Sequence, residues 1–300
     1  MITSAALTAA TARLRAAGVA DPARDARILM AHALGIAPDR VTLALSDPLS
    51  DVVSARFDGL IAARSARQPV SQLTGQRAFF GRAFRVTPEV LDPRPETETL
   101  IEAALRAPFD RVLDLGTGSG AILLTLLAER RAATGLGVDI SPGALAVARA
   151  NAADLGLSGQ ADFLLSDWFA GVARMFDLIV ANPPYIAAAE MPGLAPEVHD
   201  WEPHLALTPG GDGLSAIRRI VAGATGHLHP GGRLLMEIGA GQGRAVRALL
   251  EEGGFDAAAI LCDLDGRDRV ACAYRRAKGD AVNSGIRDTS DGFRAKKPSN

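Results

Sequence analysis

From residue 111 onward, short apolar runs alternate with segments of helical spacing. Such alternation predicts strands joined by helices, and therefore a parallel sheet with both faces covered. We expect the last two strands to form an antiparallel hairpin through Asp265 and Gly266. The seven strands that the pattern predicts span residues 111–115, 136–140, 161–165, 176–181, 232–239, 258–264 and 269–274. The chain is therefore expected to be an α/β protein.

The residues before this alternation follow a different pattern. Up to about residue 75 the sequence predicts helices alone, with a start signal at Asp21 and Pro22 and helical apolar spacing over residues 50–67. Residues 77–87 then alternate apolar and polar side chains around Gly81, which predicts a β-hairpin. The expected organisation is a helical domain over 1–75, a hairpin linker over 76–94, a second domain over 95–277 and a disordered polar tail over 278–300.

A glycine-rich turn follows the first predicted strand. Gly116, Gly118 and Gly120 allow the backbone to approach a ligand closely and to adopt positive φ. Their G-x-G-x-G spacing differs from the G-x-G-x-x-G of dinucleotide-binding proteins, which argues against a dehydrogenase. Asp139 ends the second strand, where a carboxylate is placed to accept both hydroxyls of a ribose. A nucleoside-containing ligand is therefore expected beside the turn.

The tetrapeptide Asn182-Pro183-Pro184-Tyr185 comes directly after the fourth predicted strand. The two prolines stiffen the turn, which presents a neutral carboxamide, backbone carbonyls and an aromatic ring. The Asn182 side chain and the Pro183 carbonyl could accept the two hydrogens of a planar amino group and aim its lone pair at an electrophile. The simpler alternative is a strand-terminating turn with a capping asparagine.

Two further segments carry candidate residues. Arg94 stands between two prolines, where a stiff backbone could aim its cation at a ligand. Residues 186–213 predict a loop long enough to be functional, as a lid or a substrate platform. His199 and His204 are expected to be ordinary loop residues of that segment, because no other ligand is spaced with them for a metal site.

The composition argues against several kinds of binding partner and cellular location. A net charge of −2 and a pI near 6.2 give no electrostatic signature of nucleic-acid binding. The two cysteines, Cys262 and Cys272, fit neither a metal site nor a disulfide framework, which favours the cytosol. The sequence shows neither a secretory signal nor a run long enough to span a membrane.

Taken with the strand preceding it, the glycine turn resembles a known motif. Asp114 followed by residues 115–120 is similar to motif I of class I S-adenosylmethionine-dependent methyltransferases. The wider order of motifs resembles the HemK/PrmC family of release factor-specific protein-(glutamine-N5) methyltransferases. Those motifs are PRPETE within residues 91–98, DLGTGSG at 114–120, NPPY at 182–185, ALTPGGDGL at 206–214, EIG at 237–239 and Gln242. The resemblance covers residues 5–276 and departs at Asp92, where an apolar residue is expected.

This resemblance implies a fold and a set of site residues. The fold would be a seven-stranded, Rossmann-like methyltransferase domain with an N-terminal helical bundle joined to it by a β-hairpin. An acid and an apolar residue after the third strand, here Asp167 and Trp168, would contact the adenine of the cofactor. The implied cofactor-binding residues are Gly116, Thr117, Gly118, Ser119, Gly120, Asp139, Asp167, Trp168 and Asn182. The implied substrate-binding residues are Arg94, Asn182, Pro183, Pro184 and Tyr185, of which Asn182, Pro183 and Tyr185 would be catalytic.

The resemblance also implies an activity and partners. A methyl group would pass from S-adenosylmethionine, leaving S-adenosylhomocysteine, to the glutamine amide of the Gly-Gly-Gln motif in class I peptide chain release factors. The N-terminal domain would hold the protein substrate. We expect a cytoplasmic monomer that uses no metal and binds neither nucleic acid nor membrane.

Two other functions stay open on the sequence. The same tetrapeptide serves enzymes that methylate adenine N6 or guanine N2 in nucleic acid; the acidic pI and the few aromatic residues argue against that function here. A non-catalytic interaction protein that has kept the fold would be supported by an altered Asn182 or glycine turn. Both are intact.

Overall fold

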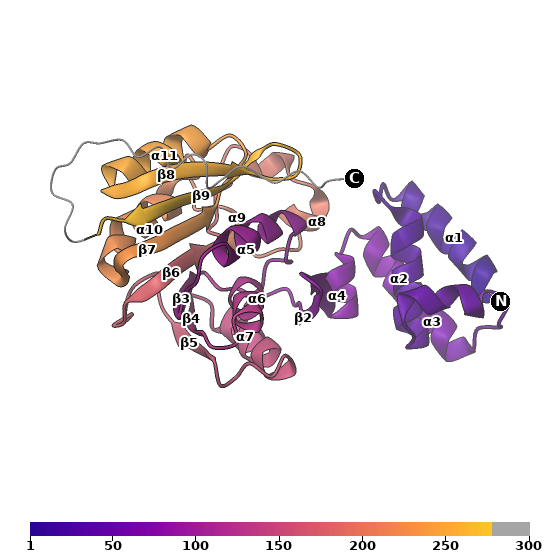
Figure 1. The fold of residues 1–300 in the computed structure, drawn as a ribbon. Helices are drawn as coiled ribbons and strands as arrows, with labels where there is room; N and C mark the ends of the chain where they lie inside the picture. The colour runs from indigo at the N-terminus through magenta and orange to yellow at the C-terminus, as the bar shows by residue number, and fades with distance from the viewer. Residues whose placement is uncertain (278–300) are drawn as a thin grey trace, which may run out of the picture.

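The computed structural model describes residues 1–277, and the predicted disordered tail lies outside them. The chain begins with helices that pack around their own apolar cluster, which includes Leu14, Leu29, Phe57 and Ile61 (Figure 1). Asp21 caps the second helix by accepting a hydrogen bond from the Arg24 amide at 3.3 Å, as its sequence signal predicts. These helices are α1 (Thr3–Ala16), α2 (Pro22–Leu34), the 3-10 helix η1 (Pro38–Ala44), α3 (Asp51–Ser65) and α4 (Val70–Thr74).

The predicted hairpin connects these helices to the rest of the chain. Its strands are β1 (Gln76–Phe79) and β2 (Arg82–Arg85), and Phe80 and Gly81 form the turn with φ of 47° and 73°. Positive φ at both central residues gives the twist that a two-residue hairpin needs. Asn151 anchors the hairpin to the second half of the chain, because its side chain bonds both the amide and the carbonyl of Arg85.

The predicted seven-stranded sheet is confirmed, with strand order β5-β4-β3-β6-β7-β9-β8. Five neighbouring strands pair in parallel, and β9 pairs antiparallel with both β7 and β8, as the predicted final hairpin requires. The fifth strand begins earlier than predicted, at Leu228. The strands are β3 (Arg111–Leu115), β4 (Thr134–Asp139), β5 (Ala161–Leu165), β6 (Phe176–Ala181), β7 (Leu228–Glu237), β8 (Phe255–Cys262) and β9 (Asp268–Arg275).

Helices cover both faces of this sheet (Figure 1). Val112 of β3 belongs to a cluster with α5, α6 and α7, whereas Leu113, the next residue, belongs to a cluster with α10 and α11. Burial on both faces explains why the strands appear in the sequence as unbroken apolar runs. The helices are α5 (Glu98–Leu105), preceded by the 3-10 helix η2 (Pro95–Thr97), α6 (Ala121–Glu129), α7 (Pro142–Asp154), α10 (Ser215–His227) and α11 (Gly243–Glu252).

The strand order places the two sequence motifs side by side. The chain builds outward from β3 through β4 to β5, then returns to add β6 on the other side of β3. Leu115 and Ala181, the last residues of β3 and β6, are register partners. The glycine turn and Asn182 therefore leave adjacent strands at the point where the strand order reverses, which is where open α/β sheets bind ligands.

The segment over residues 186–213 differs from the prediction of a loop. It contains the 3-10 helix η3 (Met191–Gly193) and two short helices, α8 (Pro196–His199) and α9 (His204–Leu207). His199 and His204 belong to these helices, and their rings lie in edge contact with centroids 5.4 Å apart. The loop prediction for the two histidines was therefore wrong, because helices of three or four residues are too short to show a helical period. Across residues 1–277, no helix combines the length and apolar character needed to cross a membrane.

Candidate active site

A cavity of about 430 Å³ opens at the carboxyl ends of β3, β4 and β6. This size suits a small-molecule ligand. Three of the predicted site residues, Gly120, Pro183 and Tyr185, are not in the lining of this cavity. The predicted site residues that do line it are Arg94, Gly116, Thr117, Gly118, Ser119, Asp139, Asp167, Trp168, Asn182 and Pro184.

Asp139 fixes the shape of the glycine turn. Its Oδ2 accepts a hydrogen bond from the Gly118 amide at 2.9 Å, and its Oδ1 accepts one from the Ser141 amide, also at 2.9 Å. Gly118 has φ of +54°, a conformation that side chains disfavour. A carboxylate has about four acceptor positions, so Asp139 keeps capacity for a ligand. It can therefore hold the turn and face the cavity at the same time.

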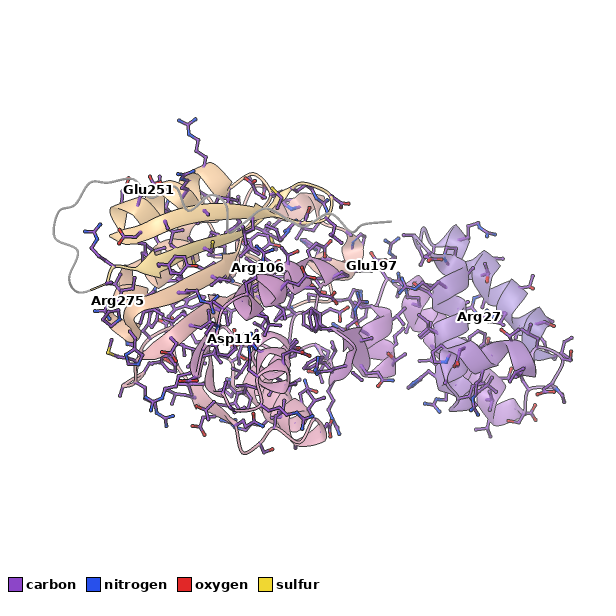
Figure 2. The ribbon with its side chains drawn as sticks, viewed as in Figure 1. Arg27, Arg106, Asp114, Glu197, Glu251 and Arg275 are labelled. Carbon is purple, nitrogen blue, oxygen red and sulfur yellow. The ribbon has the colours of Figure 1, made fainter. Side chains whose placement is uncertain are left out.

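Asp114 is fully buried beneath the turn and is labelled in Figure 2. Its Oδ2 accepts a hydrogen bond from Thr117 Oγ1 at 2.7 Å, while its Oδ1 has no hydrogen-bond partner among the described residues. Burial raises the pKa of this carboxyl to about 7, and the Thr117 hydrogen bond only partly opposes the shift.

The Asp114 pKa predicts a dependence of stability on pH. The folded-state pKa of about 7 exceeds the ordinary value of 3.8. Between those two values the folded state holds a proton that the unfolded chain has released, so the free energy of unfolding should fall as pH rises. Asp114→Asn should remove this contribution. Urea unfolding of both proteins across the interval should show the variant gaining stability relative to wild type as pH rises; parallel pH profiles would contradict the assignment.

The two candidates after β5 lie at the rim of the cavity. Asp167 is exposed and pairs with Arg219 of α10, with 2.7 Å between Oδ2 and Nη2. Trp168 has φ of +54° and packs against the apolar cluster shared with α10. A Cβ added to Gly116 would lie 3.7 Å from its ring, so the turn and the indole face each other closely.

Asn182 is held by Thr97, which is held in turn by Glu237; the motif analysis left both of these residues without a role. Its Nδ2 lies 3.4 Å from Thr97 Oγ1, and that hydroxyl donates to Glu237 Oε2 at 2.6 Å. Thr97 belongs to the PRPETE motif and Glu237 to the EIG motif, so the signal was present in the sequence. Both side chains are buried, and burial raises the pKa of Glu237.

Tyr185 lies outside the cavity lining and is held at both ends. Its hydroxyl donates to Glu237 Oε1 at 3.4 Å, and its backbone carbonyl accepts from Gln242 Nε2 at 2.9 Å. Burial, with the nearby Glu237 charge, raises the pKa of the phenol to about 12. Tyr185 therefore ends the tetrapeptide with a neutral phenol whose position is fixed at both ends.

Arg94 faces the cavity and is already paired. Its Nη2 lies 2.6 and 2.7 Å from the two carboxylate oxygens of Glu202, which is buried. The unexpected Asp92 is also buried, and it accepts a hydrogen bond from Ser71 Oγ of α4 at 3.0 Å with Arg77 nearby. A polar contact to the N-terminal helices therefore holds one oxygen of Asp92, whereas its buried Oδ1 has no hydrogen-bond partner among the described residues.

A second group of contacts joins the N-terminal helices to the segment that follows the tetrapeptide. Glu197 of α8 forms two salt bridges: its Oε1 lies 2.9 Å from Arg64 Nη2, and its Oε2 lies 2.6 Å from Arg67 Nη2. Trp201 donates to the Ala66 carbonyl at 3.3 Å. Figure 2 shows Glu197 on the side of the sheet that faces these helices. The contacts therefore couple the position of the helical bundle to the segment beside the cavity.

Glu197→Gln should lower the free energy of unfolding by about 1–2 kcal/mol, because Arg64 is buried and would lose one of its carboxylate partners. The remaining Arg64–Asp25 pair and the partial exposure of Glu197 limit the loss. Glu251→Gln is the matched control, since Glu251 forms an exposed pair with Arg247 that should contribute little. Equal urea midpoints for the two variants would contradict a stabilising role for the Glu197 cluster.

Two family models match separate segments of the chain. Residues 5–75 match the PrmC N-terminal domain family, and residues 92–197 match the methyltransferase small domain family. Among solved structures, the catalytic domain of hMettl16 in complex with MAT2A 3'UTR hairpin 6 is 16% identical, with a TM-score of 0.56 over 73% of this chain and 83% of that one. A methyltransferase from Pyrococcus furiosus is 15% identical, with a TM-score of 0.51 over 66% and 91%. These likenesses confirm the predicted class I methyltransferase fold.

Curated relatives are more similar. A release factor glutamine methyltransferase of Cereibacter sphaeroides is 62% identical over 268 residues, which is 89% of this chain and 96% of the relative. Proteins of the same name from Rhodospirillum rubrum and Caulobacter vibrioides are 47% and 42% identical, over 89% of this chain in each case and 83% and 94% of the relative. The resemblance drawn from the order of motifs is confirmed: the chain belongs to the release factor glutamine methyltransferase family.

Proposed function

We propose that this chain transfers a methyl group from S-adenosylmethionine to the side-chain amide nitrogen, N5, of the glutamine in the Gly-Gly-Gln motif of class I peptide chain release factors. The observation that carries the proposal is the Asn182 carboxamide, held by Thr97 at the wall of a cavity that also contains the glycine turn. The family membership supports the same activity.

The residues around the cavity fit the cofactor. Gly116 to Ser119 line the cavity, Asp139 keeps acceptor capacity for ribose hydroxyls, and Trp168 offers a ring to cover the adenine. We assign the adenine amino group to Asp167, whose carboxylate is exposed and can accept from it while paired with Arg219. Bound there, the cofactor supplies an electrophilic methyl carbon whose bond to sulfur breaks, with its electron pair left on sulfur, as the new bond to nitrogen forms.

The tetrapeptide would prepare the substrate nitrogen. Asn182 Oδ1 and the Pro183 carbonyl accept its two hydrogens, which fixes the amide plane and directs the nitrogen lone pair toward the cavity. Pro184 and Tyr185 pack against the glutamine side chain. The nitrogen loses one proton to water once it has gained the methyl group, so no strong base is required beforehand. Orientation of this kind is worth several kcal/mol of the barrier.

We assign the recognition of the release factor to the helical domain over residues 1–75. The hairpin linker over 76–94 would join it to the methyltransferase domain over 95–277. The Glu197 cluster supports this division, because it ties α3 to the segment that follows Tyr185. Arg94 would act at the entrance for the substrate while Glu202 holds it in place. We propose that the protein acts as a monomer in the cytoplasm, without a metal.

Mass spectrometry of a purified bacterial release factor, incubated with this protein and S-adenosylmethionine, tests the proposal. One added methyl group on the Gly-Gly-Gln glutamine is expected, together with release of S-adenosylhomocysteine. A release factor whose Gly-Gly-Gln glutamine is replaced by alanine is the matched control and should stay unmodified. Methylation of RNA or DNA with an unmodified release factor would instead support the amino methylation of a base.

A further inference from the structure

Three side chains from distant parts of the chain form one hydrogen-bonded series that runs from the wall of the cavity, where Thr97 and Asn182 lie, to the buried Glu237. Thr97 lies in η2, Asn182 follows β6, and Glu237 ends β7. Asn182 Nδ2 lies 3.4 Å from Thr97 Oγ1, which lies 2.6 Å from Glu237 Oε2. Thr97 and Glu237 are 4% and 1% exposed, so water has almost no access to compete for these bonds.

The direction of this series follows from the chemistry of its members. A carboxylate only accepts hydrogen bonds, whereas a hydroxyl has one hydrogen to give. Because Glu237 takes that hydrogen from Thr97, the hydroxyl oxygen can offer Asn182 only a lone pair. The carboxamide must then turn its amino group toward Thr97, and its Oδ1 is left for the cavity.

The orientation of the carboxamide matters because its two ends have almost the same shape and opposite polarity. With Oδ1 toward the cavity, Asn182 accepts a hydrogen from an amino group. With its amino group toward the cavity, Asn182 would place a hydrogen-bond donor against the amino group of the substrate, which is also a donor. The other oxygen of Glu237 accepts from the Tyr185 hydroxyl at 3.4 Å, so a single carboxylate is bonded directly to one end of the tetrapeptide and, through Thr97, to the other.

We propose that Thr97 and Glu237 are positioning residues that fix which end of the Asn182 carboxamide meets the amide of the substrate. This inference rests on the proposed function, and it assigns a role to the two buried polar side chains that approach the tetrapeptide from the PRPETE and EIG motifs. Neither residue needs to touch the reacting atoms. Their effect reaches the reaction through Asn182.

Three substitutions of Thr97 test the proposal. Thr97→Val keeps the volume and removes the hydroxyl, Thr97→Ser keeps the hydroxyl, and Thr97→Ala removes the hydroxyl with a smaller side chain in case valine prevents folding. For methylation of the release factor, Thr97→Val should lower kcat about 10-fold, the effect of losing one buried hydrogen bond. KM for the release factor and Kd for S-adenosylmethionine should stay within about 2-fold. Thr97→Ser should restore kcat to near the wild-type value.

A second measurement observes the hydrogen bond without catalysis. In protein labelled with 15N-asparagine, the side-chain amide signal of Asn182, assigned by its absence from Asn182→Ala, should shift in Thr97→Val and return in Thr97→Ser. An unchanged signal, or equal kcat for wild type and Thr97→Val, would overturn the proposal and leave the function standing. Equal loss in the serine and valine variants would also overturn it, in favour of a packing role. Failure of the wild-type protein to methylate any release factor would overturn the function instead, and the 15N signal would still report on the hydrogen bond.

Discussion

Asn182→Ala is expected to lower kcat for methylation of the release factor by about 100-fold or more, because the substrate nitrogen would lose one of the two acceptors proposed for it. The free amide would rotate, and its lone pair would seldom point into the cavity. Asn182 is partly exposed and its backbone position is set by Pro183 and Pro184, so the fold should be retained. Single-turnover methylation with saturating S-adenosylmethionine measures the loss.

The matched control for this substitution is Asn151→Ala. Asn151 is buried and bonds Ser119 and the Arg85 backbone, so its loss should reduce stability more than kcat. The two variants should therefore differ in what they change: Asn182→Ala should mainly lower kcat, and Asn151→Ala should mainly lower Tm. A kcat for Asn182→Ala within about 3-fold of wild type would reject Asn182 as the residue that orients the amide.

Much of the architecture could be predicted from the sequence because parallel strands buried on both faces must be apolar throughout. That constraint predicted the five parallel strands, and the turn at Asp265 and Gly266 predicted the antiparallel hairpin that completes the sheet. The meeting of the glycine turn with Asn182 followed from the rule that ligands bind where the strand order reverses. These inferences need only local patterns, each a few residues long.

The contacts behind the site follow no local pattern. Thr97 and Glu237 are 140 positions apart, and Arg64 and Glu197 are 133 apart. A buried threonine or glutamate has the same sequence context whether it caps a helix or holds another side chain. The short helices of residues 196–207 were missed for a related reason, since a single turn has no period to detect.

Asp139→Ala is expected to raise the Kd for S-adenosylmethionine by about 10- to 100-fold, the range for hydrogen bonds to a charged group. Asp139 is assigned two tasks: accepting the ribose hydroxyls and holding the Gly118 and Ser141 amides at 2.9 Å. Alanine removes both, so the binding surface is lost together with the shape of the turn. Asp139→Asn should fall between wild type and alanine, because its carboxamide oxygen can still accept one of these bonds.

Asp162→Ala is the control for this effect, since Asp162 lies on the neighbouring strand β5, is exposed and pairs with Arg174 at 3.4 Å. Isothermal titration with S-adenosylmethionine should give this control a wild-type Kd. Equal affinity for wild type and Asp139→Ala would mean that the carboxylate serves the turn alone and that the ribose is held elsewhere. Because β3 separates β4, which ends at Asp139, from β6, which precedes Asn182, the alanine variant at position 139 should recover most of its kcat at saturating S-adenosylmethionine, whereas Asn182→Ala should not.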